Sequence, residues 1–292
     1  MDAALAASYE ECKRLNSLHG KTYYLATLLL PKNKRPYVHA LYGFARYADE
    51  IVDDLASTLS PAEKAEALRS WSSGVLADLK AGTSTDHIGR ALVDTARKFD
   101  IPHQHFVDFL HSMEMDLTIT QYQTYEDLLE YVYGSAAVIG LEMVPILGFS
   151  DQRAYEAAKK LGIAFQLANF IRDVAEDLDR GRVYLPLQEL AQFGVDRAML
   201  ERRILTPEII AALKFQIARV RQLQREADIG IAYLDRVSRP CIRAASELYC
   251  GIVDEVEAIG YDIFNKRAKT STARRARVAG AAYIQAIAAR MS

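Results

Sequence analysis

The chain has 292 residues, 50% hydrophobic and 25% charged, a balance typical of a globular protein that buries a substantial core. The formal net charge of −2 gives no general attraction for nucleic acid, which is excluded as a partner. The three cysteines form an odd count without metal-ligand spacing, so a disulfide framework is excluded. With no secretory signal pattern at the N-terminus, a reducing cytoplasmic location is expected.

Helical periodicity runs through nearly the whole chain, and its breaks fall at proline or glycine. Ser60-Pro61-Ala62-Glu63 and Thr206-Pro207-Glu208 each place an N-cap residue before a proline at the first helical position. No alternating β-branched run bounded by hairpin turns is present. The pattern predicts a single all-α domain over residues 1–292. Further breaks are expected at Pro31–Pro36, Asp100–Pro102, Phe149–Asp151 and an extended loop at Gly181–Pro186.

A first acidic motif lies in the segment Arg46-Tyr47-Ala48-Asp49-Glu50-Ile51-Val52-Asp53. At ~3.6 residues per turn, the i, i+4 spacing places Asp49 and Asp53 on one helix face. Tyr42 and Arg46 fall on the same stripe. An arginine one turn before two carboxylates can hold them in position or contact a phosphate.

A second acidic motif follows in the other half of the chain, within Gln166–Asp177. Asp173 and Asp177 are again four residues apart, and Gln166 and Asn169 continue their polar stripe. A single acidic pair of this kind is usually a solvated face of an amphipathic helix. Two such pairs with arginine and amide neighbours are a more specific signal.

Four carboxylates would converge on one cavity if the two helices face each other. Two negative charges ~6 Å apart repel by roughly 3 kcal/mol at an effective dielectric constant of ~20, so this cavity would favour hard divalent cations. Mg²⁺ takes one or two carboxylates and completes its shell with water and phosphate oxygens. The two motifs therefore predict an enzyme that handles diphosphates.

The C-terminal segment from Asn265 onward contains seven basic residues and no acid. One interpretation is an exposed basic helix that partly contacts diphosphate. The other is peripheral adsorption to anionic lipid. Both interpretations remain open at this point.

These motifs together resemble those of a known family. Arg-x-x-Asp-Glu-Ile-Val-Asp, Gln-x-x-Asn-x-x-Arg-Asp-Val-x-Glu-Asp and Arg-Gly-Arg-Val-Tyr-Leu-Pro resemble squalene/phytoene synthases, from about His19 to Arg267. The form of the first motif looks most like bacterial phytoene synthases. The resemblance implies a helical prenyl-synthase fold around an apolar cavity, with the aspartate helices facing each other at its mouth.

The reaction implied by the resemblance joins two prenyl diphosphates head to head, here two geranylgeranyl diphosphates to phytoene through a cyclopropylcarbinyl diphosphate. The catalytic residues implied are Asp49, Asp53, Asp173, Asp177, Arg46 and Tyr249. The implied ligands of Mg²⁺, for which Mn²⁺ can substitute, are Asp49, Asp53, Asn169, Asp173 and Asp177. Substrate contacts are implied for His19, Arg46, Tyr131, Gln166, Asn169, Arg172, Tyr249, Lys266 and Arg267.

The sequence departs from the family pattern at two places. Gly20 stands where relatives often carry serine, which puts one hydroxyl contact to phosphate in doubt. Near the C-terminus, Lys266 and Arg267 compete for one basic contact. Small residues from Gly134 to Gly140 either leave room for prenyl chains or allow close helix packing.

Several alternatives are weighed against this interpretation. No Gly-x-Gly-x-x-Gly motif follows a strand, so a Rossmann site for NADPH is not expected. No histidine has glutamate three residues before it, which disfavours a di-iron carboxylate bundle. A non-catalytic interaction protein on the same fold would be expected to have lost the aspartates. A synthase that uses C15 substrates, giving squalene-type or hydroxysqualene products, remains the alternative.

Overall fold

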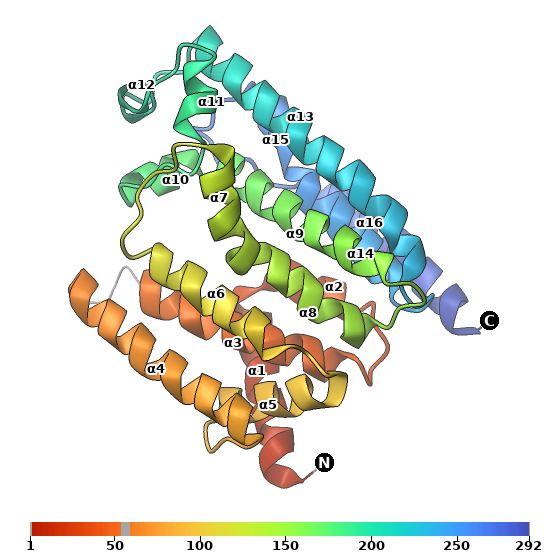
Figure 1. The fold of residues 1–292 in the computed structure, drawn as a ribbon. Coiled ribbons are helices and arrows are strands. Elements are labelled where there is room, and N and C mark those ends of the chain that lie inside the picture. Colours follow the sequence, from red (N-terminus) through yellow and green to blue (C-terminus); the bar gives the residue numbers. More distant parts are fainter. Residues whose placement is uncertain (1, 54–58, 292) are drawn as a thin grey trace.

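The structure, a computed structural model, describes residues 2–53 and 59–291, without the side chains of Asp53 and Pro61. The described chain is almost entirely helical, with two isolated β-bridges, Gln121–Val183 and Phe149–Leu234. Figure 1 shows the helices packed around one another in two groups, N-terminal and C-terminal. They are α1 (Ala3–His19), α2 (Lys21–Thr27), α3 (Arg35–Asp53), α4 (Pro61–Ala81), α5 (His87–Phe99), α6 (His103–Met115), α7 (Tyr125–Val132), the π-helix η1 (Tyr133–Ala137), α8 (Val138–Leu147), α9 (Arg153–Arg172), α10 (Val174–Asp179), α11 (Leu187–Ala191), α12 (Arg197–Glu201), α13 (Pro207–Gly230), the 3₁₀ helix η2 (Ile231–Tyr233), α14 (Arg239–Cys250), α15 (Ile252–Ala258) and α16 (Thr272–Met291).

The helix boundaries follow the local signals in the sequence. Ser60 and Glu63 form a reciprocal capping box at the start of α4, and Thr206 accepts a hydrogen bond from the backbone amide of Ile209 at the start of α13. Asp100 ends α5 in the left-handed conformation, two residues before Pro102. Most of the predicted breaks are therefore confirmed, and Gly181–Pro186 is an extended loop as expected.

Buried side chains form two clusters, one mainly from α1 to α6 and α8, the other mainly from α7 and α9 to α15. Helix α9 connects them, because it packs along α13 on one side and along α8 and η1 on the other. Tyr133 and Ile242 contact both clusters. The apolar cavity described below lies between the two clusters. That residues 1–292 form one domain remains a prediction.

Small residues allow the central helices to approach closely. A Cβ atom on Gly134 would lie 2.1 Å from the carbonyl oxygen of Asp108 in α6, and one on Gly140 would lie 2.4 Å from that of Ala158 in α9. Of the two roles predicted for this segment, Gly134 serves close packing. Gly140 serves both roles, because it also lines the apolar cavity.

The continuous helical stretch Tyr125–Leu147 is long and apolar enough to cross a membrane by length and composition alone. Its length arises because α7, η1 and α8 join without a gap. The stretch packs against α6 and α9 inside the protein, which explains its apolar composition without a membrane.

A fully buried carboxyl group lies on α8. Glu142 has no exposed surface, and neither of its carboxyl oxygens has a hydrogen-bond partner among the described residues. Burial raises the pKa of this carboxyl group well above its ordinary value of 4.5. No motif in the sequence indicated a role for Glu142, because a lone acid between apolar residues carries no functional signal there.

The protonated Glu142 makes stability depend on pH. Its pKa is higher in the folded than in the unfolded chain, so the stabilising contribution is complete below about pH 4.5 and is lost as the pH rises through the folded pKa. We expect the free energy of unfolding in urea to fall from pH 5 to pH 8 in the wild type and to fall less in Glu142→Gln. Glu142→Met should stabilise the protein at pH 8 by about 1–3 kcal/mol. The exposed control Glu66→Gln should keep the wild-type dependence, and an unchanged pH dependence in Glu142→Gln would contradict the assignment.

Candidate active site

Two cavities meet between the two groups of helices. One is a polar vestibule of about 340 Å³, bounded by α3, α6, α9, α10 and the loop after α10. The other is an apolar tunnel of about 280 Å³ between α2, α3, α8, α9 and α14. The two share their lining at the junction, so the vestibule opens directly into the tunnel. The shared residues are Tyr42, Ala45, Phe109, Ser135, Gln166 and Asn169.

The first acidic motif faces the vestibule from α3. Arg46 donates a hydrogen bond of 2.7 Å from Nη1 to Oδ2 of Asp49, and its Nη2 lies 4.0 Å from Glu50. Arg46 and Asp49 both line the vestibule, together with Tyr42. The predicted stripe of α3 is thus confirmed up to Asp49. The side chain of Asp53 lies outside the described residues, and its role as a metal ligand remains a prediction.

The second acidic motif lies opposite, where the sequence predicted one continuous helix. The structure differs here, because α9 ends at Arg172 and α10 begins at Val174, with Asp173 at φ −100° and ψ 14° between them. Asp173 and Asp177 nevertheless both line the vestibule, as do Gln166, Asn169 and Arg172. The interruption falls at the residue whose carboxylate is paired with two arginines.

Those two arginines approach Asp173 from different parts of the chain. Arg172 donates to it in a bidentate manner, from Nε to Oδ1 at 2.8 Å and from Nη2 to Oδ2. Arg267, 94 residues later in the chain, lies 3.0 Å from Oδ1 of Asp173 and 3.1 Å from Glu176. Lys266 instead lies 3.7 Å from Asp262, and its side chain is more exposed than that of Arg267. Arg267, and not Lys266, therefore pairs with an acid of the vestibule, while the choice of which one contacts diphosphate remains a prediction.

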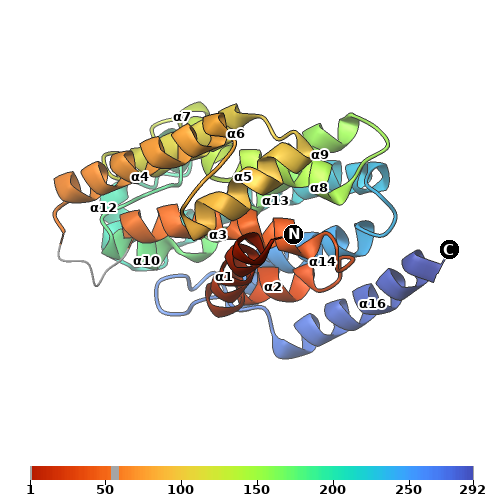
Figure 2. The ribbon, with the colours of Figure 1, turned by 90° about the horizontal axis from the view of Figure 1, so that it is seen from below.

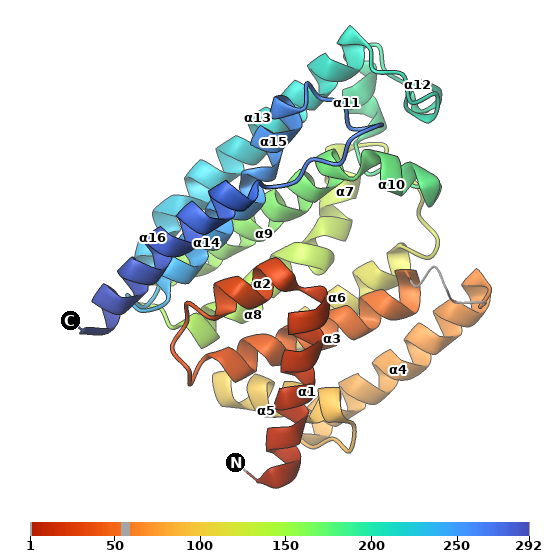
Figure 3. The same ribbon diagram turned by 180° about the vertical axis from the view of Figure 1, so that it is seen from behind.

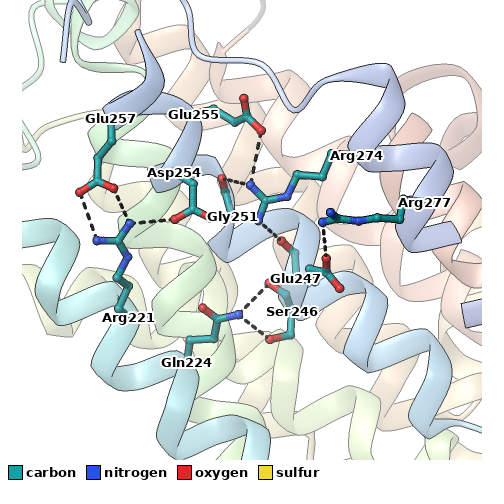
Figure 4. A network of polar contacts seen from close by, with 10 residues as sticks. All are labelled: Arg221, Gln224, Ser246, Glu247, Gly251, Asp254, Glu255, Glu257, Arg274 and Arg277. Atoms are coloured by element: carbon teal, nitrogen blue, oxygen red, sulfur yellow. Dashed lines mark hydrogen bonds and ion pairs between the residues drawn. The ribbon is translucent and has the colours of Figure 1, made fainter. Parts of the chain in front are cut away.

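The segment that carries Arg267 lies between α15 and α16, and an ion-pair network fixes both helices. Figure 4 shows Arg221 of α13 paired with Asp254 and Glu257 of α15, and Arg274 of α16 paired with Asp254 and Glu255. The two arginines share Asp254, with N–O distances of 2.8 Å to Arg221 and 2.9 Å to Arg274. The basic residue Arg274 thus has a structural role, and is not available to an external partner.

The vestibule contains acceptors suited to a hard cation. Burial and the neighbouring Asp173 raise the pKa of Asp177 to about 8, which Arg180 and Arg182 partly oppose. Oδ1 of Asn169 is buried without a hydrogen-bond partner among the described residues. These described side chains form no compact cluster of three carboxylate, imidazole or thiolate ligands. Facing acids and an unpaired amide oxygen fit Mg²⁺, which uses few carboxylates and takes its remaining ligands from water and phosphate.

The structure adds a buried polar cluster around Asp116, of which the sequence analysis named only Tyr131, as a substrate contact that remains a prediction. Tyr131 and Tyr184 donate hydrogen bonds of 2.6 and 2.8 Å to the two carboxylate oxygens of Asp116, and Arg182 donates to its backbone carbonyl. All four residues line the vestibule. An acid at the C-terminal end of α6 is electrostatically unfavourable, and that was the signal for Asp116. Arg182 and Tyr184 belong to the Arg-Gly-Arg-Val-Tyr-Leu-Pro segment, which entered the sequence analysis only through its resemblance to the family.

Aromatic rings line the passage from vestibule to tunnel. Tyr23 and Phe165 line the tunnel, and Tyr249 packs against both, with ring centroids 4.8 and 4.9 Å away. Tyr249 thus supports the tunnel wall, while its direct contact with substrate remains a prediction. His19 ends α1 and is exposed, so its substrate contact also remains a prediction.

The presence of glycine at position 20 is explained by packing, which the sequence did not reveal. A Cβ atom there would lie 2.5 Å from the ring of Tyr42 and 2.8 Å from Oδ1 of Asn16. Tyr42 stands at the junction of the two cavities. Glycine therefore allows Tyr42 to occupy its position, and serine would require that ring to move.

An all-helical shell with a charged vestibule above an apolar tunnel defines the prenyl-synthase class of fold. A family model for squalene/phytoene synthases matches residues 17–274. The 15-cis-phytoene synthase of Synechococcus elongatus is 36% identical over 285 residues, covering 94% of this chain and 91% of that protein. A chloroplastic phytoene synthase of an Oncidium hybrid cultivar is 38% identical over 286 residues, covering 96% of this chain and 68% of that protein.

Solved structures agree with these relatives. A dehydrosqualene synthase in complex with ligand has a TM-score of 0.87 and 27% identity to this chain, covering 97% of this chain and 98% of that one. The chain belongs to the squalene/phytoene synthase family, and it is a prenyltransferase.

Removing either facing carboxylate should stop turnover without unfolding the protein. We expect Asp49→Asn and Asp173→Asn each to lower kcat by at least about 100-fold, because each loses a charge that balances the cations around a departing diphosphate. Helical content by circular dichroism should be unchanged. The matched control is Glu201→Gln, an exposed acid that is ion-paired on α12. Near-normal turnover in both aspartate variants would refute their role.

The neighbouring basic residues provide a second test. Arg267→Gln should raise KM for the prenyl diphosphate and weaken inhibition by inorganic diphosphate about tenfold, because it removes a cation that bonds Asp173 at the vestibule. Lys266→Gln, which removes an equal charge one residue away, should change both values less than twofold. Equal effects of the two substitutions would show that only the overall charge matters.

Proposed function

We propose that this enzyme condenses two geranylgeranyl diphosphates head to head to phytoene through a cyclopropylcarbinyl diphosphate, releasing diphosphate. The observation that carries the proposal is the junction of the two cavities. The charged vestibule suits the diphosphate groups, and the apolar tunnel that opens from it suits the prenyl chains. The phytoene synthases among its relatives support the same reaction.

The first chemical demand is the departure of diphosphate from an allylic carbon. We propose that Asp49, Asp53, Asn169, Asp173 and Asp177 would hold Mg²⁺, or Mn²⁺ in its place, which would supply positive charge to neutralise the leaving oxygens. Arg46, Arg172 and Arg267 already surround the acids and would bind the remaining phosphate oxygens. Preorganised charge of this kind typically lowers the barrier more than any other single effect in enzyme catalysis.

The second demand is protection of the allylic cation from water. The tunnel begins at Tyr42 and Gln166 and continues between apolar side chains of α8, α9 and α14. The ring faces of Tyr23 and Phe165 would stabilise positive charge on the prenyl chain. The apolar lining would exclude water, which could otherwise attack the cation as a nucleophile. The buried pair Asp116–Tyr131 supplies a hydroxyl of fixed orientation at the vestibule wall.

The last demand separates this reaction from that of a squalene-type enzyme. Phytoene forms by loss of a proton from the final cation, whereas squalene formation needs a hydride from NADPH. We propose that NADPH is not used. The alternative is an enzyme that uses C15 substrates. The fold that this chain shares with a dehydrosqualene synthase supports that alternative.

We place the enzyme in the cytoplasm, with prenyl diphosphates as its small-molecule partners. Cys12, Cys241 and Cys250 are all unpaired and buried, as expected in a reducing compartment. Burial raises the pKa of Cys12 and Cys241 to about 12, so neither thiol is reactive at neutral pH.

Product analysis tests the proposal. The purified protein is incubated with C15 or C20 diphosphate and Mg²⁺, with and without NADPH, and the hydrocarbons are separated by chromatography. We expect a C40 hydrocarbon from the C20 substrate without NADPH, and no product when the metal is chelated. A C30 product alone would overturn the phytoene assignment, and an NADPH requirement would overturn the proposed last step.

A further inference from the structure

The apolar tunnel has a definite length, which two of its walls give independently. On α9 the lining residues follow one face of the helix from Gln166 at the junction to Ala154. On η1 and α8 they run from Ser135 at the junction to Leu147. Each run spans 12 residues, which is about 18 Å at the rise of an α-helix. Because α8 and α9 pack together and are joined by a short loop, Leu147 and Ala154 lie at the same end of the tunnel.

This far end of the tunnel is closed by buried apolar side chains. Leu147 is 3% exposed and Ala154 is 2% exposed. Leu234, which follows η2 and also lines the tunnel, is 6% exposed and forms a β-bridge with Phe149. These side chains separate the tunnel from solvent. We call Leu147, Ala154 and Leu234 the tunnel floor.

Three loops meet behind the tunnel floor. Figure 2 shows the loops after α2, α8 and α13 at one end of the molecule, and Figure 3 shows the same end from behind. Lys34, in the loop after α2, donates hydrogen bonds to the carbonyl of Leu147, to Asp235 at 3.0 Å and to Ser238 at 3.3 Å. Ser238 donates to the same carbonyl at 2.6 Å. One ammonium group therefore connects all three loops, and we call Lys34, Asp235 and Ser238 the latch.

The latch lies directly against the end of α8. Gly148 adopts φ +75°, and a Cβ atom there would lie 2.0 Å from Oδ2 of Asp235, so only glycine allows this approach. The backbone amide of Asp235 also donates a 2.8 Å hydrogen bond to the carbonyl of Gly148. The side chain of Lys34 is only 16% exposed, which shields its contacts from water. Hydrogen bonds, in addition to apolar packing, thus fix the depth of the tunnel floor.

This depth matches one length of prenyl chain. An extended isoprene unit adds four carbon–carbon bonds and is about as long as three residues of helix, roughly 4.5 Å. The four units of a C20 chain would therefore extend from the junction to the floor. A C15 chain would end one unit above the floor, and a C25 chain would not enter completely. The α9 side chains beside the fourth unit are Ala154 and Ala157, which are both small.

We propose that the tunnel floor, held in place by the latch, selects a prenyl chain of four isoprene units. The inference rests on the proposed function, because it names the residues of that site that decide the chain length. Ala154 and Leu147 contact the end of the chain and determine specificity directly. Lys34 is a positioning residue, because it acts through the carbonyl of Leu147 from behind the floor.

Binding of substrate analogues measures this selection without turnover. The full chain with Mg²⁺ is titrated in a calorimeter with non-hydrolysable prenyl thiodiphosphates of C10, C15, C20 and C25. In the wild type, each unit up to C20 should tighten binding at least about fivefold, because it buries more apolar surface. The C25 analogue should bind at least about tenfold more weakly than the C20 analogue, because its last unit meets a packed floor.

Two substitutions at the floor should move this optimum in opposite directions. Ala154→Phe places a six-carbon ring where the fourth unit would lie, so the C15 analogue should become the tightest ligand. Leu147→Ala removes three carbons from the floor, so the C25 analogue should bind at least about tenfold more tightly than it does in the wild type. The matched controls are Ala77→Phe on α4 and Ile284→Ala on α16, at two exposed positions. Both controls should keep the optimum at C20, and circular dichroism should confirm helical content in all four variants.

Lys34→Met tests the latch, because it keeps most of the side chain and removes its hydrogen bonds. The floor should then be displaced more easily, and the preference for C20 over C25 should narrow at least about fivefold. Lys34→Arg should keep the wild-type preference, because it still donates hydrogen bonds. A lower melting temperature in Lys34→Met with an unchanged preference would refute the positioning role.

Two results would overturn the proposal as a whole. The first is an optimum that stays at C20 in both floor variants while both are folded. The second is a wild-type optimum at any length other than C20. Failure of the proposed reaction gives a different result, because product analysis would then yield no C40 hydrocarbon while the binding optimum still moved with the floor.

Discussion

Charge balance across the vestibule is the constraint on which the rest of the structure depends. Aspartates from α3 and from the α9–α10 junction face one cavity, and each set has its own arginine, Arg46 on one side and Arg172 with Arg267 on the other. Without those cations the acids would repel one another, and nothing would offset the solvation that they lose on burial. The raised pKa of Asp177 shows that the arginines do not fully neutralise the negative charge at this residue. A divalent cation would therefore stabilise the ionised acids most at this position.

The sharp change from charged to apolar lining follows from how the helices pack. Helix α9 presents Gln166 and Asn169 at the junction and Leu161 and Ala158 deeper in the tunnel, so one helix contributes to both environments. Close approach at Gly140 and the missing side chain at Gly20 bring α8 and Tyr42 into position. Diphosphate chemistry and a water-free tunnel are therefore adjacent because they share the same few helices.

The C-terminal basic segment divides into parts with different physical roles. Arg267 pairs with Asp173 at the vestibule, Arg274 connects α16 to α15, and Arg275 and Arg277 are exposed on α16. The two interpretations of this segment therefore concern different residues in it.

Periodicity and short motifs were enough to predict helices, their caps and the two acidic stripes, because i, i+4 spacing and N-cap chemistry are local properties of the backbone. The sequence motifs also identified Arg46, Gln166 and Asn169 as neighbours of the acids. Local patterns could not predict the break at Asp173, the pairing of Arg267 with it, or the Asp116–Tyr131–Tyr184 cluster. These contacts join residues 15 to 94 positions apart, whose distances are set by helix packing. The sequence by itself thus determined which chemical groups this protein has available. Only the tertiary structure decided which charges meet, because electrostatic energy depends on distance in space and not on distance along the chain.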